Sequence, residues 1–209
     1  MSYIMLSDGP PKDPPAELPA PTKEQLTAFY AAFGAAVATW QRVEVFVYLL
    51  FAHIIQSAHE RPLSAAYHQV MNFSTRLSML DEAVAARYAG NPETQPTAEA
   101  WEQISTRISR KSKSRNKIAH YVLYFDPTMR NKERQMFISV SAVHPDRDNI
   151  NNSAIHGSEL TDMSKAFETL LQEAIAFGHG VDGLGAVVVG CYPRACHTLG
   201  NPADKVGFL

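Results

Sequence analysis

The sequence predicts an all-α fold, a helical bundle with a short β-hairpin inserted before its last helix. Two observations support this prediction. Apolar residues recur every three or four positions over long segments, which is the period of an amphipathic helix. Two short segments rich in β-branched and aromatic residues then follow one another across a polar loop. A chain of 209 residues is long enough for one well-packed domain and leaves little for a second.

The first predicted helix begins at Lys23, after Thr22 as a plausible N-cap, and runs to about Ile55. Between residues 43 and 55 it is apolar on nearly every face, which predicts burial on more than one side, either at the centre of the bundle or at a dimer interface. Its apolar residues at helical spacing are Phe29, Phe33, Val37, Trp40, Val43, Val47, Leu50 and Ile54.

Two further helices are expected before the hairpin. One begins at Pro62 and continues to the Gly90-Asn91-Pro92 break, and the next opens near Thr97 and reaches the region of His120. Trp101, Ile104, Ile108 and Ile118 mark the inner face of this third helix.

The hairpin is predicted from strands at 121–125 and 135–140, separated by Asp126-Pro127 and a polar stretch. The last helix is expected over about Leu160 to Phe177, with its cap near Thr161 and its end at the glycines that follow.

These elements divide the chain into a leader at 1–22, a helical domain at 23–179 and a glycine-rich irregular tail at 180–209. The leader carries six prolines and few bulky apolar residues, so we expect it to be disordered. It is interpreted as a plain extended leader, with a polyproline ligand for a partner as the alternative.

The N-terminal segment, the longest apolar run, the cysteine count and the net charge limit the kinds of protein that the chain could be. Residues 1–10 lack a basic start followed by an apolar core, so a secretory signal is not expected. The apolar run at 45–55 is too short to span a bilayer. Two cysteines make no disulfide framework, and a net charge of −2 favours no class of partner. We expect a cytoplasmic protein without a membrane partner.

The segment from Ser114 to Tyr121 is the most informative in the chain because it places Arg115, Asn116 and His120 near the end of a helix. Arginine is a permanent cation that binds phosphate through a bidentate fork. Histidine can give and take a proton near neutral pH. Together they suffice to cleave a phosphodiester without a metal, so no metal or cofactor is expected.

The spacing of these residues raises a geometric question. At about 100° per residue, Arg115 falls within roughly 20° of the apolar stripe, whereas His120 lies roughly 140° further round the helix. Either the helix ends just before His120, or the working site is shared across a two-fold axis. Asn116 shares a face with His120 and is suited to orient its ring or a phosphate oxygen.

Glu44 is the expected supporting residue, because a carboxylate among the apolar residues of the first helix is costly unless it is paired. It is expected to hold Arg115 or His120 in place. The structural alternative is a salt bridge without a catalytic part, with His120 making a helix-end hydrogen bond.

A run of cations precedes and surrounds the motif without an acidic residue among them, which would attract a polyanion such as RNA. A solvated helix face is the alternative reading. The candidate RNA-binding residues beside the motif are Arg107, Arg110, Lys111, Lys113 and Lys117.

Metal sites are not predicted elsewhere. The helices carry no Glu-x-x-His pair of a di-iron bundle. Cys191 and Cys196-His197 would need further ligands to bind zinc, and unpaired thiols are the preferred reading of their irregular spacing.

The Arg115-Asn116-x-x-x-His120 motif at the end of a bundle helix resembles the R-x(4–6)-H signature of the HEPN superfamily. The resemblance extends over roughly Lys23 to Phe177, and its specific part is the motif together with the order of the helices. It implies a four- to five-helix up-and-down bundle that forms a homodimer.

The resemblance also implies a function. Many members of the superfamily are metal-independent endoribonucleases, often toxins or defence effectors, in which both subunits' motifs line one cleft. Carried over to this chain, Arg115 would steady the phosphate, His120 would act as acid and base, and Asn116 would be the polar residue that follows the arginine. The alternative is a non-catalytic module that binds a nucleotide, RNA or a protein partner, and a further reading adds an antitoxin partner.

Overall fold

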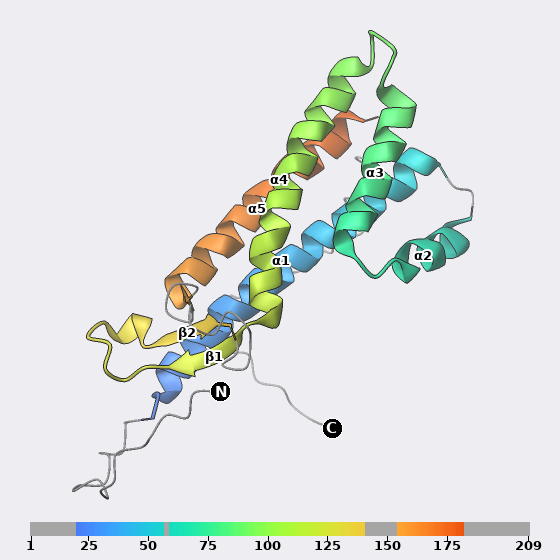
Figure 1. The fold of residues 1–209 in the computed structure, drawn as a ribbon. Helices are drawn as coiled ribbons and strands as arrows, with labels where there is room; N and C mark the ends of the chain where they lie inside the picture. The colour runs from blue at the N-terminus through green and yellow to red at the C-terminus, as the bar shows by residue number, and fades with distance from the viewer. Residues whose placement is uncertain (1–19, 57–58, 141–153, 182–209) are drawn as a thin grey trace, which may run out of the picture.

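The computed structural model describes residues 20–56, 59–140 and 154–181. Within them the chain is mostly helical, with a small three-stranded sheet at one end (Figure 1). The helices are α1 (Lys23–Ile55), α2 (Glu60–Gln69), α3 (Phe73–Tyr88), α4 (Gln95–His120) and α5 (Gly157–Gly180). The leader at 1–19 and the tail beyond 181, with its cysteines, lie outside the described residues.

Helix α1 is the central element of the bundle and packs chiefly against α5 and α3. Thr22 caps it as predicted: its side chain accepts from the Gln25 N–H at 3.3 Å, and Gln25 Oε1 accepts from the Thr22 N–H at 2.8 Å. The apolar surface of this helix was expected to lie either at the centre of the bundle or at a dimer interface. Within one chain, α1 occupies the central position. Its burial is incomplete, because Val45 remains 50% exposed.

The second predicted helix is wrong as a single element, because α2 and α3 replace it. The chain is extended at Val70 and Asn72, and Met71 between them is 90% exposed. Asn72 begins α3 by accepting from the Ser74 N–H at 2.9 Å. A short polar side chain that caps a new helix competes with continuation of the old one. Helices α3 and α4 then run antiparallel (Figure 1).

The predicted hairpin is present as β1 (Val122–Phe125) and β2 (Met136–Ser139), which pair antiparallel with Val122 opposite Ser139. A short 3-10 turn, η1 (Lys132–Arg134), lies in their connection. A third strand, β3 (Ile155–His156), pairs with β2 and was not predicted; two residues carry too little pattern to be read from sequence.

The start of the last helix was placed too late. Helix α5 begins at Gly157, where Glu159 Oε2 accepts from the His156 N–H at 2.8 Å. Thr161 therefore lies inside the first turns and bonds to the Gly157 carbonyl. The helix also continues through Gly178 to Gly180. Gly178 is buried, so it packs within the helix and does not end it.

By length and hydropathy, α1 is the one helix in the described ranges that could cross a membrane, a test that the core helix of a soluble protein also passes. Trp40, Phe46 and Leu50 on its inner face are at most 1% exposed. The same ranges contain no group of three or more His, Cys, Asp or Glu side chains placed to hold a metal ion.

Candidate functional site

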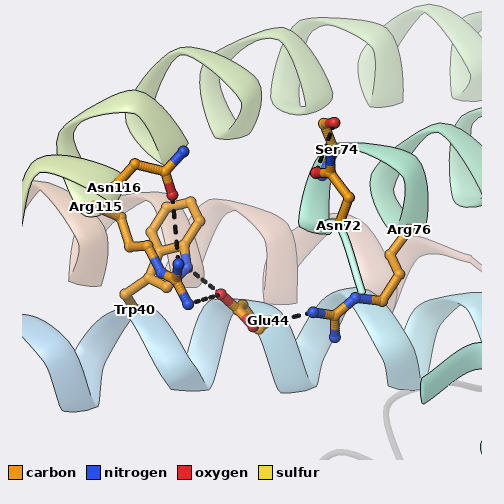
Figure 2. A network of polar contacts seen from close by, with 7 residues as sticks. All are labelled: Trp40, Glu44, Asn72, Ser74, Arg76, Arg115 and Asn116. Carbon is orange, nitrogen blue, oxygen red and sulfur yellow. Dashed lines mark hydrogen bonds and ion pairs between the residues drawn. The ribbon is translucent and has the colours of Figure 1, made fainter. Parts of the chain in front are cut away.

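The carboxylate of Glu44 is the centre of a polar network between α1, α3 and α4 (Figure 2). Its Oε1 accepts from Trp40 Nε1 at 2.6 Å and lies 3.2 Å from Arg115 Nη2. Its Oε2 lies 3.8 Å from Arg76 Nη2. The pairing of Glu44 with Arg115 was expected from the sequence, whereas Arg76 was not.

Trp40 fixes the position of this carboxylate. It lies one helical turn before Glu44 on α1, so the two side chains share a face. Its ring makes edge contacts with Phe73 and Phe167, with ring centroids 5.2 and 5.1 Å away, and is 1% exposed. The indole N–H is therefore held toward Glu44 by packing from two other helices.

Arg115 is turned toward the bundle, as its position near the apolar stripe predicted. Its side chain is 37% exposed, compared with 17% for Glu44, so the arginine pairs with the carboxylate while its side chain remains partly open to solvent. Nη1 of Arg115 donates to Asn116 Oδ1 at 3.3 Å. Asn116 thus contacts the arginine beside it, and its expected contact with the His120 ring is not formed.

His120 is the last residue of α4 and is exposed. Within the described residues its side chain makes no hydrogen bond or ion pair, so the helix-end hydrogen bond of the structural alternative is absent there. Helix α4 does not end before His120. In a single copy, Arg115 and His120 therefore point in directions roughly 140° apart, with a rise of roughly 7.5 Å between them.

The structure divides the predicted RNA-binding cations into two groups. Arg107 pairs with Glu173 of α5, with Nη1 2.8 Å from Oε2, and Lys111 is half-buried. The second group is Arg110, Lys113 and Lys117, whose side chains are exposed. Because these residues and His120 follow one another at spacings of three or four, all four lie on one helix face within about 80°. We call Arg110, Lys113, Lys117 and His120 the α4 ridge.

Three cavities lie in the described part of the chain. One of about 650 Å³ lies between the start of α1, the hairpin and the start of α5. Another, of about 580 Å³, lies between α3 and α4, and a third, of about 500 Å³, lies between α1 and α3. Arg115, Asn116 and His120 line none of the three, although the cavity between α3 and α4 reaches Ser112, three residues before Arg115.

Comparison of the chain with protein-family models, curated proteins and solved structures found no match. The resemblance to the HEPN superfamily therefore rests on the motif and the order of the helices.

Proposed function

We propose that the protein is a metal-independent endoribonuclease of HEPN type, whose site joins Arg115 of one copy to His120 of a second. The observation that carries the proposal is the contrast between two residues at the end of α4, one held in place and one free to react. Arg115 is oriented by Glu44, and His120, one and a half turns later, is exposed and unengaged within the described residues.

The chemistry follows from the two side chains. Neutral His120 takes the proton from a ribose 2′-hydroxyl, and the resulting oxygen attacks the adjacent phosphorus. Arg115 donates to the non-bridging oxygens, where negative charge grows. The bond to the 5′-oxygen breaks, and an imidazolium returns a proton to that leaving oxygen. The products are a 2′,3′-cyclic phosphate end and a 5′-hydroxyl end.

A second copy is required because the two side chains diverge on one straight helix. Two-fold symmetry near the C-terminal half of α4 would set Arg115 of each copy against His120 of the other, since a two-fold interface presents the same surface from both sides.

The direct test is incubation of the purified protein with a mixed RNA pool in EDTA, followed by sequencing of the new ends. Cleavage that leaves cyclic phosphate ends supports the proposal. An intact RNA pool at every protein concentration would count against the enzyme and favour the second candidate.

That second candidate is a non-catalytic module that binds RNA, a nucleotide or a protein partner at the same surface. The contact between Glu44 and Arg115 favours it, because a carboxylate offsets part of the charge that catalysis would use. RNA binding without cleavage by the wild-type protein would identify this role. A toxin or defence role, with an antitoxin partner, is implied by the resemblance alone.

The α4 ridge is expected to carry the salt-dependent part of RNA binding. Changing Arg110, Lys113 and Lys117 together to glutamine should weaken single-stranded RNA binding and lower the slope of log K against log salt by about 2, at roughly 0.7 for each lost phosphate contact. Fluorescence anisotropy across a salt series measures both quantities.

The matched control removes three exposed cations from other helices, Lys23, Arg61 and Lys165. It changes the net charge by the same amount. If the control lowers the slope as much as the ridge variant does, the attraction belongs to the whole protein and not to the ridge.

A further inference from the structure

Arg76 is an arginine of α3 whose side chain is 17% exposed. We propose that Arg76 is a positioning residue that neutralises Glu44, so that Arg115 keeps its positive charge for a substrate phosphate. This rests on the proposed phosphate-binding role of Arg115.

The geometry gives each arginine its own carboxylate oxygen. Arg115 approaches Oε1, which also accepts from Trp40, and Arg76 lies on the side of Oε2 (Figure 2). The cluster therefore holds two guanidinium groups and one carboxylate, an excess of one positive charge. At 3.8 Å the contact of Arg76 with Oε2 is an ion pair longer than a normal hydrogen bond, so its contribution is mainly electrostatic.

The two arginines that pair with Glu44 differ in burial. Arg76 and Glu44 are both 17% exposed, whereas Arg115 is 37% exposed. Charges act on each other more strongly where water is excluded and screening is weak. Arg115 lies closer to the carboxylate, at 3.2 Å compared with 3.8 Å for Arg76, so both arginines act on Glu44. Arg76 supplies the positive charge that water screens least, and Arg115 is the guanidinium that stays more accessible to a substrate.

A second contact of Arg76, with the ring of Tyr67, supplies no competing negative charge. Its guanidinium carbon lies 5.7 Å from the ring centroid of Tyr67, a residue that is 1% exposed. Burial raises the pKa of Tyr67 to about 12, although the charge of Arg76 acts in the opposite direction. The phenol is therefore neutral at physiological pH, and the ring offers Arg76 only its face.

Removal of Arg76 should leave Glu44 with Arg115 as its sole cationic partner in this network. Glu44 would then hold Arg115 more tightly and cancel its charge, and the surface would lose affinity for phosphate. A merely structural role for Arg76 predicts lower stability with no change in RNA affinity of the folded protein.

The test measures binding of a fluorescent single-stranded RNA in a His120→Ala background, so that cleavage does not interfere. We expect Arg76→Gln to raise Kd about tenfold, equivalent to ~1.4 kcal/mol. Arg76→Lys, which keeps the charge, should remain within about threefold of the parent. The double variant Arg76→Gln/Glu44→Gln removes both charges of the pair and should restore binding to a similar level.

Arg87 provides the matched control. It lies on the same helix, its guanidinium is 5.5 Å from the ring centroid of Tyr88, and it donates to the Ile54 carbonyl at 3.0 Å. Arg87→Gln makes the same change in net charge and should leave Kd within about twofold.

The outcomes separate the two proposals. If Arg115→Ala weakens binding and Arg76→Gln does not, the role of Arg76 is wrong and the proposed function stands. If Arg115→Ala leaves binding unchanged, the role of Arg76 is wrong, and the proposed function is overturned only if Arg115→Ala in the otherwise wild-type protein also cleaves RNA at the wild-type rate. If Arg76→Gln does not fold, the double variant and Arg76→Lys provide the test. If both of these variants melt like the wild type and neither binds RNA, the role of Arg76 is wrong.

Discussion

Replacement of His120 by alanine is expected to lower the rate of RNA cleavage by roughly 10²–10⁴-fold, the contribution of a positioned acid–base group. The fold should be unaffected, because the side chain is exposed and makes no hydrogen bond or ion pair among the described residues. Initial cleavage rates in EDTA measure the effect, and thermal melting checks the fold.

His179 is a suitable control for this variant. It is also an exposed histidine in the last turn of a long helix, α5, and it lies outside the motif. His179→Ala should cleave at the wild-type rate. If His120→Ala cleaves RNA as fast as the wild type, the acid–base assignment is wrong.

Replacement of Trp40 by alanine is expected to have the largest effect on stability. The side chain is 1% exposed and packs on Phe73 and Phe167, so its removal leaves a large cavity at the junction of three helices. Substitutions of this kind cost about 3–5 kcal/mol of unfolding free energy. The loss of the 2.6 Å hydrogen bond would also leave Glu44 less well held.

Urea denaturation measures this cost, with Tyr30→Ala as the control. Tyr30 lies on the same helix and is 56% exposed, so its replacement should change the unfolding free energy by no more than about 0.5 kcal/mol. A loss below about 1 kcal/mol for Trp40→Ala would contradict the close packing of this side chain between α3 and α5.

Helical periodicity was sufficient to predict the positions of α1 and α4, and the short segments rich in β-branched and aromatic residues predicted the hairpin strands. The break between α2 and α3 was missed, since the apolar residues on its two sides continue one helical spacing. At this break the side chain of Asn72 caps α3, which marks the start of a new helix where the apolar pattern predicts one continuous helix. The strand β3 depends on pairing with β2, which is a tertiary contact. The early start of α5 has a local signal that was missed, the Glu159 side chain that accepts from the His156 N–H.

The candidate site shows the same division. A carboxylate among the apolar residues of a helix predicted that a cationic partner would be present, and Glu44 does pair with Arg115. Arg76 could not be predicted, because its direction depends on the helix break that the pattern concealed. The separation of Arg107 from the α4 ridge likewise depends on Glu173 of a helix remote in sequence.

The central claim is that Arg115 and His120 act together across two copies of the chain. It is tested most directly by mixing two inactive variants, Arg115→Ala and His120→Ala, after unfolding and refolding them together. The mixture should regain roughly a quarter of the wild-type cleavage rate, since half of the dimers are mixed and each mixed dimer has one complete site. A mixture as inactive as its parents, beside an active wild type, would contradict a site shared between two copies.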